Sequence, residues 1–328
     1  MRLWMLGGWV DGSILNGNAP RMVRSVCQKV TLGQGWTWMS RKKLGTKRGL
    51  MPNHVIVSTL GWAAKSLEAA FAGIGDMEMG QAELAIFQAF GDLRPKALAD
   101  GGRAAVEASA VRIRDALAKN SMKRVATMYT GVGDGPLPIV EEVRRMLAVA
   151  DLAVELGVGL ITTLSSPAGT PFGAAVARLR SITDAVSSRG IQVCMKTHRG
   201  LVGEMPGDAV RMCEAIPGLG LTLEASHFYV GANQGEVFWE VIPHVRHVTM
   251  RDARGMPAAL QMVPGYGEVD FAGIVTRLHE RAYDGLFAIE YVDLRPVEGP
   301  DYVQRDVVSS IIGMRSLFVS LEKQLGVR

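Results

Sequence analysis

From Asn53 onward, short apolar runs alternate with longer segments in which apolar residues recur every three or four positions. The short runs are typical of buried parallel strands, and the longer segments are typical of the helices that cover such strands. Strand and helix alternate eight times in this way. The predicted strands are residues 54–59, 76–79, 124–129, 158–164, 191–196, 219–224, 244–250 and 286–292.

Eight such pairs in roughly 275 residues have the count and the length of a closed barrel. We therefore predict an α/β fold, a (β/α)8 TIM barrel that residues 53–328 form as a single domain after a basic N-terminal extension. The structural alternative is a doubly wound open sheet, which usually carries a glycine-rich loop after its first strand. The sequence shows neither that loop nor a phosphate-binding loop.

Residues 1–52 differ from the rest of the chain. The first 51 residues carry nine Lys or Arg and only one acid, Asp11, and they contain four of the six tryptophans. One interpretation is a basic arm for an acidic partner. The other, which we favour, is that the segment is a poorly ordered extension or lies upstream of a biological start near Met51.

The composition argues against several classes of protein. Hydrophobic residues make up 48% of the chain and charged residues 21%, as in a soluble globular protein. No apolar run approaches the roughly 18 residues needed to span a bilayer. Three cysteines without metal-ligand spacing suit a reducing cytoplasm. After residue 51 the chain holds 27 bases and 31 acids, so we expect a cytoplasmic protein with neither a membrane nor a nucleic acid as partner.

The carboxyl ends of the predicted strands carry the candidate chemistry, because TIM barrels place their catalytic groups there. Alternate side chains of a strand share a face, which groups residues two apart. The predicted catalytic residues are Lys196, His198, Glu224, His227 and Glu290. The predicted substrate contacts are Glu78, Thr249, Arg251 and Asp252. His247 is expected in the core or the bottom layer.

Several of these residues also have a purely structural interpretation. Arg251 and Asp252 would then pair with each other, and the two histidines would hold loops. Lys196 is harder to explain in that way, because an ammonium group buried without partners is too costly. We expect Lys196 to pair with Glu224 and Glu290.

The chain resembles a known family. The strand ends and the segment PGYGEVDFAGIVTRLHERAYDGLFAIEY, residues 264–291, resemble the xylose isomerase-like barrels. That family includes sugar phosphate isomerases and epimerases, hydroxypyruvate isomerases, dehydratases and the AP endonuclease 2 group. The resemblance covers residues 53–328, and its most specific parts are the P-G-x-G-x-x-D run, the YDG before the last strand, and an acid three residues before His227.

In this family a divalent metal usually lies on Glu, Asp, His and Glu from the fifth to the eighth strand. The resemblance places the eighth-strand ligand on Glu290 and the sixth-strand acid on Glu224, but the fifth-strand Glu falls on Lys196 and the seventh-strand His on Thr249. Because a charged lysine repels a cation, we favour a site without a metal cofactor. The alternative is a rebuilt site for Mn, Zn or Mg, with the ligands Glu224, His227, Glu290 and His198.

The resemblance implies an enzyme of carbohydrate metabolism, an isomerase, an epimerase or a dehydratase-like lyase. We expect it to move a proton next to a carbonyl of a small carbohydrate-like substrate, a keto-sugar or a cyclic polyol. Lys196 would stabilise the oxyanion, Glu290 or Glu224 would be the general base, and His198 or His227 would protonate the product. A Schiff base at Lys196 is a less favoured route.

Three other hypotheses remain open at this point. The first is a metal-dependent enzyme of the same class, and the second is a non-catalytic sugar-binding barrel that serves as a subunit. DNA repair comes last, because that branch needs many metal ligands and this chain has six histidines in all. A homo-oligomer is compatible with each of them.

Overall fold

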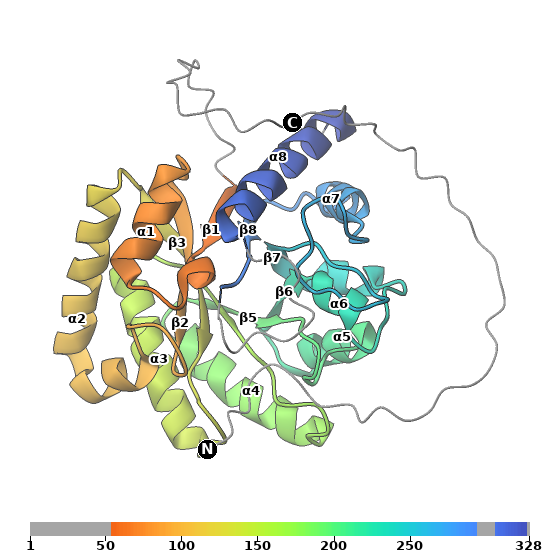
Figure 1. Cartoon of the computed structure of the whole chain (residues 1–328). Helices are drawn as coiled ribbons and strands as arrows, with labels where there is room; N and C mark the ends of the chain where they lie inside the picture. The colour runs from red at the N-terminus through yellow and green to blue at the C-terminus, as the bar shows by residue number, and fades with distance from the viewer. Residues whose placement is uncertain (1–53, 294–305, 327–328) are drawn as a thin grey trace. The chain divides into compact units, whose positions relative to one another are not determined.

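The computed structural model describes residues 54–293 and 306–326, so the prediction for residues 1–52 lies outside the described residues. Eight parallel strands close into a barrel in chain order, and β1 pairs with β8 (Figure 1). The strands are β1 Val55–Ser58, β2 Gln81–Phe87, β3 Arg124–Gly131, β4 Leu160–Thr163, β5 Gln192–Lys196, β6 Gly220–Glu224, β7 Val245–Met250 and β8 Phe287–Ile289. The predicted (β/α)8 fold is confirmed.

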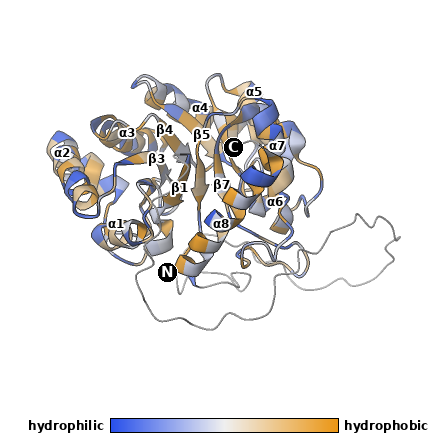
Figure 2. Ribbon diagram, turned by 90° about the horizontal axis from the view of Figure 1, so that it is seen from above, coloured by the Kyte–Doolittle hydropathy of each residue, from blue (hydrophilic) through white to orange (hydrophobic). Residues whose placement is uncertain are grey.

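A helix follows each strand, and the helices surround the barrel, as the view from above shows (Figure 2). The α-helices are α1 Leu67–Asp76, α2 Pro95–Lys119, α3 Ile139–Glu155, α4 Phe172–Ser187, α5 Pro206–Ala215, α6 Ser226–Val230, α7 Phe271–Glu280 and α8 Val307–Leu325. The residues that the structure describes also contain two 3-10 helices, η1 Thr59–Trp62 and η2 Trp239–His244. Within the described residues, no helix has the length and apolar character that a membrane crossing requires.

Local sequence signals explain where several helices begin. The Asp270 carboxylate accepts a hydrogen bond from the Gly273 amide at 2.8 Å, which caps α7. Asp306 caps α8 in the same way through the Ser309 amide at 3.0 Å. Gly326 ends α8 with a φ of 65°, a conformation that glycine adopts at little cost. These caps lie at the starts and the end that the hydrophobic pattern predicts.

The predicted position of the second strand is wrong. Residues 76–79 form the end of α1 and a turn, and the strand starts only at Gln81. The chain turns at Glu78 with a φ of 57°, and its side chain is exposed at the amino end of β2. Glu78 therefore lies at the opposite end of the barrel from the carboxyl ends of the strands, so the structure does not bring it to the other predicted site residues.

The barrel has an apolar outer layer and a polar interior. The outward side chains of the strands pack against the helices and form the main core with residues such as Phe71, Ile74 and Leu152. A second apolar cluster lies at the carboxyl ends of the strands and consists of Leu60, Phe87, Tyr129, Leu260 and Val292. Hydrogen bonds between strands that are not neighbours, such as Thr162 Oγ1 to Thr222 Oγ1 at 2.7 Å, cross the interior.

Candidate functional site

The centre of the site is a buried lysine between two carboxylates. Lys196 ends β5, Glu224 ends β6, and Glu290 follows β8, so three strands bring their charged groups into the interior. The Lys196 Nζ donates a hydrogen bond to Glu290 Oε1 at 2.6 Å and lies 3.5 Å from Glu224 Oε2. All three side chains are at most 3% exposed. The ion pairs expected for Lys196 are thus present.

The ends of β5 and β6 are joined by a residue that the sequence analysis missed. The Thr197 hydroxyl accepts a hydrogen bond from the Glu224 amide at 2.8 Å and donates one to the Glu224 carbonyl at 3.3 Å. Ser226 donates its hydroxyl to Glu224 Oε1. These bonds fix the Glu224 backbone and one of its carboxylate oxygens, so that Oε2 faces Lys196.

Arg251 brings a second cation to the carboxylates. Its Nη2 lies 3.8 Å from Glu224 Oε2 and 4.0 Å from Glu290 Oε1, and the side chain is buried. The same guanidinium nitrogen donates to His227 Nε2 at 3.1 Å. Because Arg251 is a donor only, His227 Nε2 is the acceptor and the proton of the neutral ring is on Nδ1. Arg251 therefore belongs to the charged centre itself.

The two predicted histidines lie against each other. The rings of His198 and His227 have centroids 3.8 Å apart at an interplanar angle of 35°. Burial, helped by the positive charges of Lys196 and Arg251, lowers the pKa of His198 to about 3. Burial also lowers the pKa of His227 well below its ordinary value. Both imidazoles are neutral at neutral pH, and His198 Nδ1 donates to the Arg199 carbonyl at 2.7 Å.

Aromatic and acidic residues from β2 and β3 complete the interior, and the sequence analysis missed both. The Tyr129 ring lies over the Lys196 ammonium, 4.2 Å from Nζ to the ring centroid, which is a cation–π contact. Glu83 is 1% exposed and accepts a hydrogen bond from His247 Nε2 at 2.8 Å. The alternation within QAELAIF contains the signal for Glu83, but it was hidden by the misplaced second strand.

Polar atoms without a hydrogen-bond partner lie in the same part of the barrel interior. In residues 54–293 and 306–326, five buried side-chain polar atoms lack a hydrogen-bond partner, and all five belong to residues described above or to Thr249. They are Glu83 Oε1, Glu224 Oε2, His227 Nδ1, Thr249 Oγ1 and Glu290 Oε2. Because buried polar groups nearly always have partners, these atoms need water or a polar ligand.

The protonation of Glu290 is shifted by its surroundings. Burial raises the pKa of Glu290, the nearby charge of Glu224 adds to the increase, and the charges of Lys196 and Arg251 oppose it. A raised pKa makes this carboxylate a stronger base than an exposed glutamate. Its free oxygen and its pKa are the two properties that a general base requires.

The predicted role of Asp252 is not supported by its contacts. Its Oδ2 accepts hydrogen bonds from the amides of Gly265 at 2.8 Å and Gly267 at 2.9 Å, and its Oδ1 accepts one from Ala253 at 2.9 Å. Asp252 thus holds the PGYG segment, residues 264–267, against the end of β7. We leave it out of the proposed site.

The donor set does not fit a divalent metal ion. The positions that the family resemblance assigns to a carboxylate and an imidazole are occupied by the Lys196 ammonium and the Thr249 hydroxyl, and Thr249 pairs in register with Glu224. Two cations, Lys196 and Arg251, already lie within 4.0 Å of the carboxylates. In the part of the chain that the structure describes, no three His, Cys, Asp or Glu side chains are grouped as a metal site needs.

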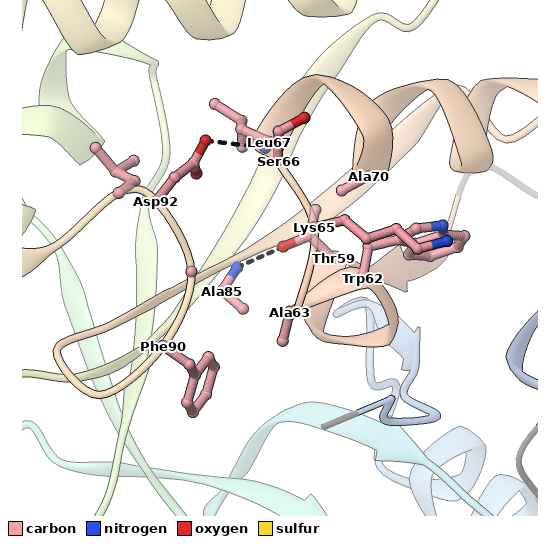
Figure 3. Close-up of a pocket in the computed structure, with 12 residues that line it drawn as sticks. Thr59, Trp62, Ala63, Lys65, Ser66, Leu67, Ala70, Ala85, Phe90 and Asp92 are labelled. Atoms are coloured by element: carbon pink, nitrogen blue, oxygen red, sulfur yellow. Dashed lines mark hydrogen bonds between the residues drawn. The ribbon is translucent and has the colours of Figure 1, made fainter. Parts of the chain in front are cut away.

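A small hollow lies beside the barrel mouth, at the ends of β1 and β2 (Figure 3). Its polar groups serve the fold: Thr59 Oγ1 accepts from the Ala85 amide at 2.9 Å, and Asp92 accepts from the Leu67 amide at 3.3 Å. None of the residues predicted for the site lines it. We therefore locate the candidate site at the charged centre and not at this hollow.

Comparisons with known proteins agree with the fold. Residues 82–307 match the protein family described as a xylose isomerase-like TIM barrel. A search of curated proteins gives no match.

Solved structures resemble the barrel along most of its length. A xylose isomerase-like TIM barrel protein from Mycobacterium smegmatis in complex with magnesium has 14% identity and a TM-score of 0.62, with 82% of this chain and 96% of that chain covered. A D-allulose 3-epimerase from Methylomonas sp. in complex with D-allulose has 14% identity and a TM-score of 0.60, with coverage of 81% and 96%. A probable 3-DHS dehydratase from Bacillus anthracis has 14% identity and a TM-score of 0.57, with coverage of 81% and 98%. The likeness to these structures is one of fold, while the family match extends over most of the chain, so the chain belongs to the xylose isomerase-like TIM-barrel family.

Proposed function

We propose that this chain is an enzyme that moves a proton next to a carbonyl of a keto-sugar or a cyclic polyol, without a metal ion. The product would be an isomer, an epimer or the result of an elimination. The observation that carries the proposal is the Lys196 ammonium 2.6 Å from Glu290 Oε1, in a site where five buried acceptor or donor atoms lack a hydrogen-bond partner within the described residues. The family match and the fold shared with an epimerase and a probable dehydratase support the class of reaction.

Glu290 is the proposed general base. Its Oε2 is buried without a partner, so it is available to a proton on the substrate. Because burial and Glu224 raise its pKa, the carboxylate takes up a proton more readily than an exposed glutamate does. Glu224 is more restrained, since Ser226 donates to its Oε1, and we assign it to holding Lys196 and Arg251.

Lys196 is the proposed electrostatic partner of the oxyanion. When the proton leaves carbon, negative charge develops on the neighbouring carbonyl oxygen, and a fixed ammonium group in a buried site stabilises that charge more than water does. The Tyr129 ring and the two carboxylates hold Nζ in place before substrate binds. The cation thus supplies the stabilisation that a divalent ion provides in many proton-transfer enzymes.

His227 is proposed as a neutral hydrogen-bond donor. Arg251 occupies Nε2, so the proton is on Nδ1, which has no partner. A neutral imidazole donates to an enolate oxygen without giving up its proton entirely. This role replaces the protonation of product that the sequence analysis assigned to a histidine, because the low pKa of His198 and His227 leaves both rings uncharged.

The test of the reaction is exchange of carbon-bound hydrogen for solvent deuterium. The protein is incubated in D2O with a panel of ketoses and keto-inositols in the presence of a chelator, and deuterium at the carbon next to the carbonyl is measured by mass spectrometry. We expect incorporation with the wild type and a loss of at least 100-fold with Glu290→Gln, which keeps the shape of the side chain but is not a base. If the wild type incorporates no deuterium from any member of the panel, the proposal is wrong.

The test of the metal-free site is metal content. The wild type and a Lys196→Glu variant are purified without chelators, and metals are measured by elemental analysis. We expect no stoichiometric ion in the wild type. We expect about one Mn, Zn or Co per chain in Lys196→Glu, because three carboxylates then face one another. A stoichiometric ion in the wild type would mean that the histidines hold a rebuilt site.

A further inference from the structure

A second ion pair lies in the barrel interior next to Lys196 and joins β2 to β7. His247 Nε2 lies 2.8 Å from Glu83 Oε2, and the two side chains are at most 1% exposed. Since β2 and β7 are not neighbours in the barrel, this contact crosses the interior. The proposed reaction does not use it.

Both ring nitrogens of His247 face acceptors. The Leu286 carbonyl, which only accepts, lies 3.1 Å from Nδ1, so Nδ1 carries a hydrogen. The contact of 2.8 Å between Nε2 and the Glu83 carboxylate also requires a hydrogen between the two atoms. The pair therefore holds one proton more than a neutral imidazole and a carboxylate would hold together.

The other contacts of Glu83 place that proton on the imidazole. Thr127 donates its hydroxyl to the same Oε2 at 3.2 Å, which favours the ionised carboxylate. Burial on its own raises the pKa of Glu83, but the hydrogen bond from His247, the charges of His247 and Lys196, and Ser58 bring it below the usual range. An ionised Glu83 leaves the imidazolium as the only form that satisfies both contacts of His247.

We propose that His247 is a buried imidazolium held by Glu83, and that this pair is a positioning element that sets the charge beside Lys196 and Glu290. With it, the interior contains three cations, Lys196, Arg251 and His247, and three carboxylates, Glu83, Glu224 and Glu290. The centre is then neutral as a whole, which a buried cluster needs. The proposed proton on His247 is argued from the contacts of His247 and Glu83, and only its effect on catalysis rests on the proposed function.

The charged groups that face the pair come from several strands. Lys196 on β5 lowers the pKa of Glu83, and Glu83 in turn contributes to the raised pKa of Glu290 after β8. Ser58 on β1 and Thr127 on β3 face the carboxylate, and Thr222 on β6 pairs in register with His247. If the imidazolium were lost, the charge of Glu83 would raise the pKa of Glu290 further and leave less of the base ionised at neutral pH.

The direct experiment is nitrogen-15 NMR of the full chain labelled in its histidines. At pH 8 we expect the His247 ring, assigned by its loss in His247→Gln, to show two N–H groups with the shifts of an imidazolium. In the same spectrum His198 and His227 should show one N–H each. The chain unfolded in urea is the reference, because its histidines have the ordinary pKa of about 6.5. A single N–H on the His247 ring at pH 8 would overturn the proposal.

A charge-matched pair of variants tests the effect on Glu290. His247→Gln leaves Glu83 without its cation, which raises the pKa of Glu290. In a plot of the rate of deuterium exchange against pH, the acid limb is the range in which the rate falls as Glu290 is protonated, and we expect this limb to move up by about one pH unit. The double variant Glu83→Gln/His247→Gln is neutral again and should return the limb to its wild-type position. A limb that stays shifted in a folded double variant would mean that the pair acts through packing and not through charge. If the NMR result holds but the wild type shows no exchange, the proposed function fails and the imidazolium stands.

Discussion

Replacing Lys196 by methionine is the most direct perturbation of the charged centre. Methionine has nearly the same length and leaves little space unfilled, so the variant removes the charge with its contacts: the hydrogen bond of 2.6 Å to Glu290, the ion pair with Glu224 and the cation–π contact with Tyr129. Glu224 and Glu290 would then keep Arg251 as their nearest cation, at 3.8 Å and 4.0 Å. Removing one partner of a buried ion pair costs roughly 3–5 kcal/mol, and we expect a loss of that size in the free energy of unfolding at pH 7.

The pH dependence of this loss separates charge from packing. Lys196 lowers the pKa of Glu290, so the pKa of Glu290 rises further without it, above the value in the unfolded chain. A carboxyl whose pKa is raised by folding binds its proton more tightly in the folded state, and the folded state is therefore favoured as the pH falls. The difference between Lys196→Met and wild type should shrink when the pH is lowered from 7 to 5.5.

Urea unfolding followed by circular dichroism measures both quantities, with wild type and variant compared at each pH. Lys196→Met/Glu290→Gln is the matched control, because it removes the cation together with one of its carboxylates and should regain about half of the loss or more. A loss below about 1 kcal/mol at pH 7, or a loss that is the same at pH 5.5, would refute the buried ion pair as described.

Two further predictions concern residues beside the centre. The pKa of His198 is lowered to about 3, so the stability from its neutral ring is complete above the unfolded value of about 6.5 and is lost as the pH falls. Between pH 7 and pH 5, wild type should lose about 2 kcal/mol more than His198→Gln in urea unfolding; equal losses would mean that the ring is charged in the folded protein. Asp252→Asn should cost about 1–3 kcal/mol in the same assay at pH 7, because the amide cannot accept all three bonds from Ala253, Gly265 and Gly267. An unchanged midpoint would show that the PGYG segment does not depend on the carboxylate.

The apolar cluster at the strand ends affects the strength of the charge interactions at the centre. Leu60, Phe87, Tyr129, Leu260 and Val292 are buried at the carboxyl end of the barrel, and the Tyr129 ring contacts both this cluster and Lys196. Charges next to an apolar, water-poor layer interact more strongly than charges in water. This arrangement favours the electrostatic role assigned to Lys196.

The charged residues of the interior show which part of the site could be predicted from the sequence. Lys196, Glu224 and Glu290 could be grouped from the ends of three predicted strands, and the ion pairs expected among them are present. Those three residues alone carry one net negative charge. Arg251 adds a positive charge, although the sequence analysis placed it among the substrate contacts. The pair of Glu83 and His247 contributes no net charge once its proton is counted.

The sequence by itself determined the barrel and indicated the strand ends where the candidate site lies. Eight alternations of strand and helix permit few other folds, and the alternation of side chains fixes which residues face inward once a strand is placed correctly. Where the placement failed, at β2, the inward residue Glu83 was missed and the exposed Glu78 was chosen in its place.

Only the tertiary structure decided which inward residues touch. The distance across a barrel depends on the stagger and tilt of the strands, and these are set by pairing between segments far apart in the chain. Lys196 therefore meets Glu290, which is 94 residues away, and His247 meets Glu83, 164 residues away. The low pKa of the two histidines and the binding of Asp252 to the PGYG segment have the same origin, because burial and partners arise from packing and not from spacing along the sequence.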